Sequence, residues 1–151
     1  MRFARGGFWI CAVLALLPGC GQRGGGVDAA ATVRVTDAWS RTSPPGARAG
    51  VVYLTLASDA GDRLIAVSVP ASVAGRAEMH EVFEDAARRL GMRPVDGVDL
   101  PAGAAIVFGP GGRHIMLTAL ARPLMAGDTL AVTLRFRRAV TRTVPVVVRD
   151  E

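Results

Sequence analysis

Hydrophobic and polar residues alternate along most of the chain from about residue 33 onward. The alternating runs are short, rich in β-branched residues and separated by turn-forming glycine, proline and aspartate. They predict strands near residues 33–35, 51–56, 64–69, 76–83, 90–94, 105–108, 114–120, 129–136 and 141–148. Only residues 83–90 have some helical character, and a segment this short also fits a hairpin loop. The pattern predicts an all-β sandwich or barrel of about seven to nine strands.

The first residues have the order of a bacterial export signal. Two arginines precede an apolar run at 8–17, and small residues follow it. The run is too short to cross a bilayer as a permanent helix. Leu17-Pro18-Gly19-Cys20 resembles the lipobox of bacterial lipoproteins, in which the cysteine is acylated, although proline at its second position departs from the usual pattern. We expect residues 1–20 to be an export signal of the lipoprotein type with Cys20 as the lipidation site; ordinary cleavage is the alternative.

The chain after Cys20 consists of a tether followed by a folded domain. Residues 21–32 are rich in glycine and alanine without periodicity, as in flexible linkers. We expect one copper-binding domain at 33–149. No cysteine follows Cys20, so neither a disulfide nor thiol chemistry is available to this domain. The expected location is the periplasm or cell envelope, anchored to a membrane through Cys20.

The charge pattern excludes one class of function. The formal net charge is +5, and about +3 without Arg2 and Arg5 of the leader; every basic residue is arginine. The arginines are scattered, as a GC-rich genome would produce, although an anion-binding face is the alternative. Aromatic residues are few and form no stacking motif, so nucleic-acid binding has no support.

No Ser-His-Asp frame, nucleophile elbow or carboxylate pair is visible, so we do not expect an enzyme.

Histidine and methionine form one spaced frame. The only two histidines are His80 and His114; Met92 follows His80 after eleven intervening residues, and Met116 follows His114 after one. A neutral, polarizable thioether suits Cu(I), whereas hard cations prefer oxygen donors. Zinc more usually recruits thiolate or carboxylate. The frame therefore predicts a copper site.

Strand alternation places half of this frame. In the strand at 114–120, we expect Ile115, Leu117 and Ala119 on the core face, which leaves His114 and Met116 together on the opposite face. The loop at 109–112 lacks the features of a phosphate cradle and is expected to present His114 at the rim of the domain.

The position of the other half of the frame, His80 and Met92, depends on a hairpin. If the hairpin at 80–92 centres on Ala86, His80 and Met92 become directly facing residues with Cβ atoms about 5 Å apart. A slip of one residue would turn one donor to the other face. Packing or surface positions are expected for the remaining candidates, which are Trp39, Tyr53, Glu78, Met79, Glu81, Glu84, Asp85 and Met125.

With these residues the chain resembles the periplasmic PCuAC copper chaperone family. The similarity runs from about Val33 to Val148 and takes in the His and Met frame and its flanking segments. These segments are Asp37-Ala38-Trp39, Gly61-Asp62-Arg63-Leu64, Arg93-Pro94-Val95, Pro110 to Leu117, Arg122-Pro123-Leu124 and Gly127-Asp128. Family members often have methionine directly after the first histidine, where this chain has Glu81.

The resemblance implies a fold, a cargo and a destination. The implied fold is a cupredoxin-like β-sandwich (Greek-key barrel), and the implied Cu(I) ligands are His80, Met92, His114 and Met116, holding one ion per domain. The implied role is copper delivery towards the copper A centre of cytochrome c oxidase, with a Sco-like thiol protein or oxidase subunit II as acceptor. We expect a monomer.

Two other copper functions use related chemistry. An electron-transfer cupredoxin requires a cysteine ligand, which residues 33–149 lack. A copper sequestration or resistance protein of the cell envelope would use the same ligands to retain the ion, and the sequence does not separate it from a carrier.

Overall fold

The computed structural model describes residues 31–150, and in this part of the chain it contains ten strands and no helix. The strands are β1 (Val33–Arg41), β2 (Ala49–Ser58), β3 (Asp62–Ser68), β4 (Ala74–Glu84), β5 (Leu90–Pro94), β6 (Val98–Leu100), β7 (Ala105–Phe108), β8 (His114–Leu120), β9 (Thr129–Phe136) and β10 (Arg142–Arg149). The expected export signal, the expected lipidation site Cys20 and most of the expected tether lie outside the described residues. Within residues 31–150, no helix has the length and hydropathy needed to span a membrane.

Each strand that the alternating pattern predicts is present, and the all-β class is confirmed. The additional strand is β6, whose three residues are too few to show a period. In β8 the expected core face holds for Ile115 and Leu117, which are fully buried, but is wrong for Ala119, which is exposed. The φ of Ala119 is 54°, in the left-handed region, so the regular alternation of the strand ends there.

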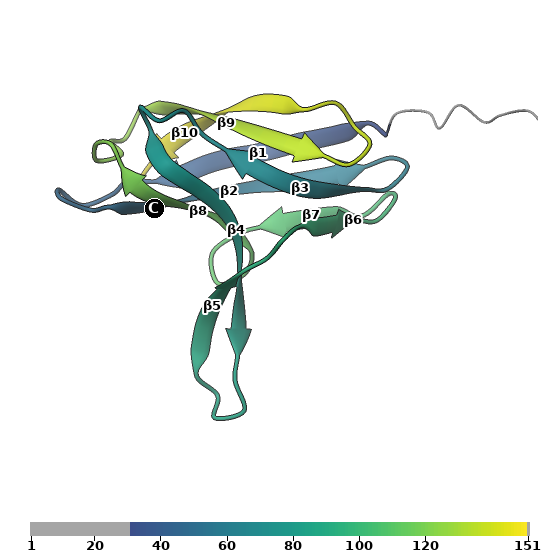
Figure 1. Ribbon diagram of the computed structural model, residues 1–151, viewed down its shortest axis with the longest axis horizontal. Coiled ribbons are helices and arrows are strands. Elements are labelled where there is room, and N and C mark those ends of the chain that lie inside the picture. Colours follow the sequence, from purple (N-terminus) through teal and green to yellow (C-terminus); the bar gives the residue numbers. More distant parts are fainter. Residues whose placement is uncertain (1–30, 151) are drawn as a thin grey trace, which may run out of the picture.

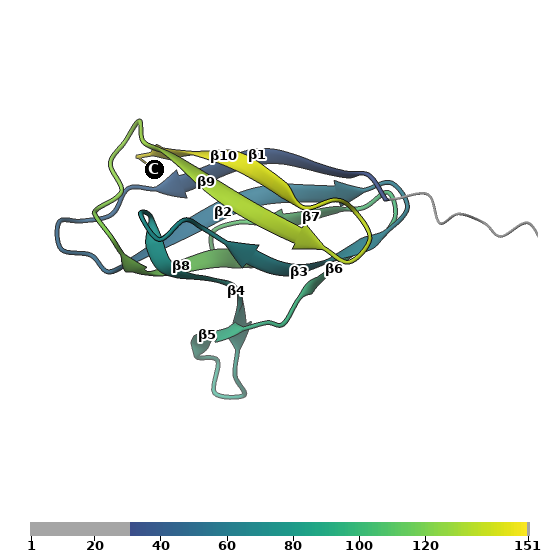
Figure 2. The ribbon, with the colours of Figure 1, turned by 45° about the horizontal axis from the view of Figure 1, so that its top comes forward.

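The strands form one hydrogen-bonded sheet in the order β5-β4-β8-β2-β1-β10-β9-β3-β6, with β7 also paired to β2. The pairing of β1 with β10 is parallel, and the other strand pairs are antiparallel. The sheet curls over itself (Figures 1 and 2). Buried side chains of β2, β8, β9 and β10 belong to one hydrophobic core.

The core is built from the inward positions of these strands. Six inward hydrophobic side chains of β2 and β9 are at most 2% exposed: Val52, Leu54, Leu56, Leu130, Val132 and Leu134. Burying a side chain of this size contributes about 1.5–3 kcal/mol relative to leaving it in water. Because side chains on a strand alternate between faces, burial of this inner set fixes which residues lie on the outer face.

The β4–β5 hairpin extends away from the body of the domain (Figures 1 and 2). The first part of β4 pairs with β8 as far as His80, and the residues after His80 pair only with β5. The hairpin loop is held by Asp85, whose Oδ1 accepts hydrogen bonds from the backbone N–H groups of Ala87 (2.8 Å) and Arg89 (2.9 Å). His80 therefore lies where the hairpin leaves the body.

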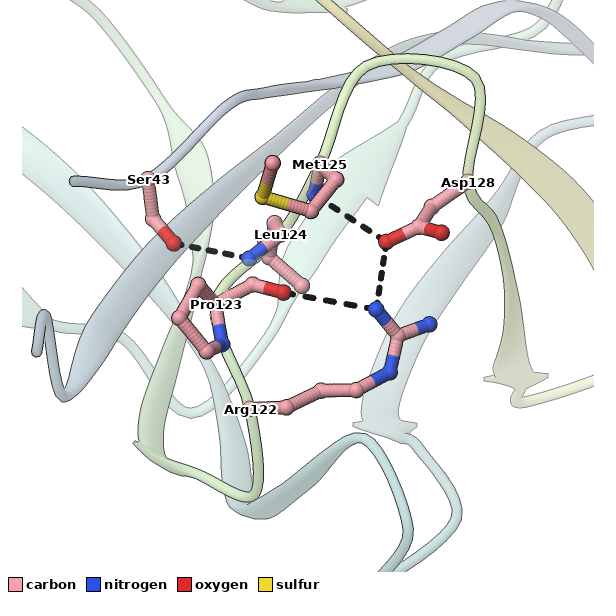
Figure 3. Close-up of polar contacts among 6 residues, drawn as sticks. All are labelled: Ser43, Arg122, Pro123, Leu124, Met125 and Asp128. Carbon is pink, nitrogen blue, oxygen red and sulfur yellow. Dashed lines mark hydrogen bonds and ion pairs between the residues drawn. The ribbon is translucent and has the colours of Figure 1, made fainter. Parts of the chain in front are cut away.

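The loop between β8 and β9 ties that end of β8 to the segment after β1 (Figure 3). The Arg122 guanidinium donates to Asp128 Oδ2 (2.7 Å), which also accepts from the Met125 backbone N–H (3.0 Å). The hydrogen bond from Arg122 lowers the pKa of Asp128 below its ordinary value. The Leu124 N–H donates to Ser43 Oγ (2.8 Å), while Leu124 itself is only 1% exposed.

The burial of Leu117 on β8 predicts a large effect when this side chain is shortened. Leu117→Ala removes a side chain with 0% exposure and leaves a cavity, so it should lower the free energy of unfolding by about 2–5 kcal/mol. The matched control is Val107→Ala on β7, where the side chain is 61% exposed and the change should stay within about 0.5 kcal/mol. Urea unfolding of both variants measures the difference; equal losses would contradict this description of the core.

Asp62, the first residue of β3, ties that strand to the segment after β9. Its carboxylate accepts hydrogen bonds from the backbone N–H groups of Arg138 (3.0 Å) and Ala139 (2.7 Å). Burial raises the pKa of Asp62, but the backbone N–H groups of Ala139, Arg63 and Arg138 lower it by more, so the pKa lies below its ordinary value of 3.8. Folding therefore favours the ionised carboxylate.

A lowered pKa in the folded state makes stability depend on acid. The contribution of Asp62 is present above the pKa of the unfolded chain, and it is lost as the pH falls through the lower, folded pKa. Asp62→Asn has one acceptor oxygen in place of two, so near neutral pH it should lose about 1 kcal/mol of unfolding free energy. Its stability should also fall less steeply than that of the parent below about pH 4. Denaturation curves across this range would show parallel slopes if the assignment is wrong.

Candidate metal centre

The two histidines lie side by side on neighbouring strands. His80 of β4 is the direct register partner of His114 of β8, and their ring centroids are 5.8 Å apart. Directly paired residues of antiparallel strands project from the same face of the sheet. The fold thus brings together two imidazoles that are separated by thirty-three residues of chain.

His114 is held in a defined orientation at the start of β8. Its Nδ1 lies 3.1 Å from the carbonyl oxygen of Gly112, an arrangement in which Nδ1–H donates and the lone pair of Nε2 is left for another partner. The preceding turn is closed by a hydrogen bond from Gly112 N–H to Gly109 O (3.0 Å). Gly111 has a φ of 74° in this turn, a conformation that favours glycine.

The Nε2 atoms of both rings lack a hydrogen-bond partner among the described residues. Nε2 of His80 and Nε2 of His114 are buried and accept or donate no hydrogen bond. His114 as a whole is only 5% exposed. A buried polar group without a partner costs about 1–3 kcal/mol, and coordination of a metal ion would satisfy both nitrogens at once. The pair therefore fits a metal ion that prefers nitrogen donors.

Met116 lies next to this pair on the same face. It follows His114 by two residues on β8 and is the register partner of Glu78 on β4 and of Val51 on β2. The shared face expected for His114 and Met116 is therefore present. A shallow surface hollow beside Met116 is lined by Arg41, Thr42, Ser43, Pro44, Ala49, Gly50 and Val51.

Met92 shares the face but does not lie opposite His80. The expected hairpin centre at Ala86 is wrong: the structure pairs His80 with Pro94, and Met92 with Val82. The reason is the loop, in which Arg88 adopts a φ of 60° and moves the turn one residue further along. A shift of the centre by one residue moves each partner by two positions, so Met92 stays on the His80 face as a diagonal neighbour, within reach of a long side chain. It is 60% exposed.

The other candidates fall where packing or surface positions were expected, with one exception. Met79 is buried in the core at 5% exposure, and Met125 is 59% exposed on the β8–β9 loop. Glu81 is paired with Arg93 on β5, whose guanidinium donates to it at 2.7 Å. The rings of Trp39 and Tyr53 pack against each other with centroids 4.7 Å apart.

The exception is Glu78, which the sequence pattern assigned to the solvated surface. It lies on the same face as the histidines, two residues before His80, and its Oε2 is 4.0 Å from His80 Nε2. The period of two along β4 was the signal that could have placed it there. In residues 31–150, no three His, Cys, Asp or Glu side chains form a group that could hold a metal ion.

Comparison with known proteins shows a lipoprotein family. The family described as "Putative lipoprotein LpqE-like" matches residues 33–148. The protein named "Putative lipoprotein Lxx21020" from Leifsonia xyli subsp. xyli is 33% identical over 118 residues, which are 78% of this chain and 70% of that protein.

Solved structures show the same fold. The apo PCuAC domain from PmoF1 is 25% identical and superimposes with a TM-score of 0.66 over 79% of this chain and 94% of its own. The Cu(I) form of DR1885 from Deinococcus radiodurans is 28% identical, with a TM-score of 0.58 over 76% of each chain. The copper-bound PCuAC domain from PmoF2, at 24% identity and a TM-score of 0.64, adds support for the fold alone. The expected cupredoxin-like fold is confirmed, and the chain belongs to the LpqE-like lipoprotein family with a domain of PCuAC type.

Proposed function

We propose that this domain is a copper carrier that binds one Cu(I) ion through His80, His114, Met116 and Met92. The observation that carries the proposal is that His80 and His114, which are directly paired across β4 and β8, each have a buried Nε2 atom without a hydrogen-bond partner. Two imidazole nitrogens with thioether sulfurs form a neutral, soft donor set that suits Cu(I). No catalytic step is needed for this role.

The relatives support the cargo and the location. The similar structure of DR1885 is a Cu(I) form, which supports Cu(I) as the ion bound here. Membership of a lipoprotein family supports a place in the cell envelope, with Cys20 as the acylated anchor. The carrier would then work outside the cytoplasm, on the periplasmic side of a membrane.

The donors differ in their access to solvent, which gives an order to ion exchange. His114 is 5% exposed, whereas Met92 is 60% exposed at the edge strand of the sheet. An incoming ligand would displace Met92 first and the buried histidine last. Thiolates of an acceptor are charged and stronger donors for Cu(I) than thioethers, so transfer proceeds towards them.

This order favours delivery over sequestration. A storage site gains from enclosing all its donors, whereas an exposed donor allows a partner to enter the coordination sphere. A Sco-like thiol protein or subunit II of cytochrome c oxidase has the required acceptor chemistry, and the copper A centre is the proposed destination.

The ligand set is tested by anaerobic Cu(I) competition against a colorimetric chelator. The chain should carry Cys11→Ser and Cys20→Ser, so that thiolates do not bind the ion. One equivalent should bind, and His114→Ala should weaken binding by at least about tenfold because a buried donor is removed. Met116→Leu, which keeps the apolar volume, should weaken it less. Parent-like binding by both variants would show that the ligand assignment is wrong.

Met92 should affect release more than folding. In the same background, Met92→Leu should speed transfer of Cu(I) to a dithiol chelator by about tenfold, because the exposed donor no longer has to be displaced. Met125→Leu is the matched control, since its side chain is exposed to nearly the same extent, 59% against 60%, on a loop outside the candidate centre. Stopped-flow transfer rates compare the two, and identical rates would remove Met92 from the proposed set.

A further inference from the structure

The end of the domain at which the described chain begins carries four arginines. Arg34 lies on β1 close to this start, and Arg137, Arg138 and Arg142 lie in or beside the loop between β9 and β10. The start of β1 and this loop lie at the same end of the domain (Figures 1 and 2). The Arg142 guanidinium joins them by donating a hydrogen bond to the carbonyl oxygen of Val33. These four arginines define the tether-side face.

The positive charge of the tether-side face is only partly compensated. Its four arginines are exposed, and within residues 31–150 none of them makes an ion pair. Of the carboxylates at this end, Asp99 pairs with Arg63 at 2.7 Å, while Asp59 and Asp62 accept hydrogen bonds from backbone N–H groups. Asp62 also interacts electrostatically with Arg138. A net positive charge remains, and it would attract an anionic surface.

An exposed apolar side chain lies among these arginines. Val140, in the loop between β9 and β10, is 73% exposed. The hollow beside it is lined by Ala31, Thr32, Val33, Ala139, Val140 and Arg142. Arginines around an exposed apolar side chain suit the surface of a phospholipid bilayer, where charged headgroups cover the acyl chains.

The length of chain before the described part brings this face close to a membrane. Ten residues separate Cys20, the proposed lipid anchor, from Ala31. Such a stretch reaches at most about 40 Å when it is fully extended. An acylated Cys20 would therefore keep the tether-side face at a high effective concentration of headgroups, so that even weak contacts suffice for docking.

We propose that the tether-side face docks on the anionic phospholipid headgroups of the membrane to which the chain is anchored. This inference rests on the envelope location in the proposed function, and not on copper binding. The arginines contact the phosphate groups, and Val140 enters the boundary between headgroups and acyl chains. The β4–β5 hairpin leaves the side of the body and not this end, so docking leaves the candidate centre accessible (Figures 1 and 2).

Vesicle binding tests the proposal with residues 20–151 carrying Cys20→Ser, so that neither an acyl chain nor the apolar run at 8–17 contributes. All ten strands and the core side chains described above lie within this chain. It should bind vesicles of mixed phosphatidylglycerol and phosphatidylcholine, and bind phosphatidylcholine alone at least about tenfold more weakly. Added salt should weaken binding to the anionic vesicles. Absence of binding to the anionic vesicles would overturn the proposal.

A double variant identifies the surface. Arg34→Gln with Arg137→Gln should weaken binding to the anionic vesicles by at least about tenfold, because each arginine near such a surface contributes about fivefold. Neither guanidinium has a hydrogen-bond or ion-pair partner in the described part of the chain, so the fold should be unaffected. Val140→Ser should weaken binding by about threefold, because less apolar surface is buried in the bilayer.

The matched control is Arg41→Gln with Arg48→Gln. It removes the same charge from exposed positions at the end of β1 and just before β2, at the far end of both strands from Ala31. Its vesicle binding should stay within about twofold of the parent's, and thermal melts check that every variant folds. If the two double variants lose equal affinity, or neither loses any, the tether-side face is not the docking surface.

Cu(I) competition on the same proteins separates this inference from the proposed copper function. All variants should bind Cu(I) like the parent, because the exchanged residues lie outside the candidate centre. A parent that binds anionic vesicles through the tether-side face but binds no Cu(I) would leave the docking surface standing while the copper function fails. Parent-like Cu(I) binding without vesicle binding would overturn the docking surface alone.

Discussion

The antiparallel register between β4 and β8 is the constraint on which the candidate centre depends. The inner face of this strand pair joins Met79 to Ile115 and Ala77 to Leu117, and these side chains contribute to the core. The outer face of the same register joins His80 to His114. A slip of one residue would turn His80 into the core and Met79 towards solvent, so hydrophobic burial holds the two imidazoles opposite each other. The energy of the core therefore maintains the geometry of the site.

The same strands also determine how accessible each proposed donor is to solvent. β8 lies inside the sheet between β4 and β2, whereas β5 is an edge strand, and the hairpin it forms with β4 extends beyond the body. On β8, His114 is buried and Met116 is half-buried, whereas Met92 on the edge strand β5 is exposed. Order in ligand exchange follows from the position of each strand in the sheet, without a separate moving element.

Local periodicity was sufficient for the parts of the fold that depend on one strand at a time. Alternation predicted the strands and placed His114 and Met116 on one face. It failed where a backbone conformation has no sequence signal: Arg88 and Ala119 adopt positive φ although neither is glycine, which moved the hairpin centre and ended the alternation of β8. The direct pairing of His80 with His114 depends on which strands become neighbours. That choice is made by long-range packing, and the chain from His80 to His114 does not encode it in any local pattern.

The chemistry of the proposed site follows from the residue types that this domain contains. Residues 33–149 contain no cysteine, so the soft donors available to them are thioethers, which do not form disulfides. A thioether binds without charge, and the rings of His80 and His114 are neutral when they act as ligands. In the proposed role, such a set would hold Cu(I) less strongly than thiolates, so a bound ion would be retained against water yet lost to a thiol acceptor. Weak donors on a rigid sheet are thus better suited to a carrier than strong donors would be, since rigidity supplies the selectivity and the neutral ligands keep the transfer favourable.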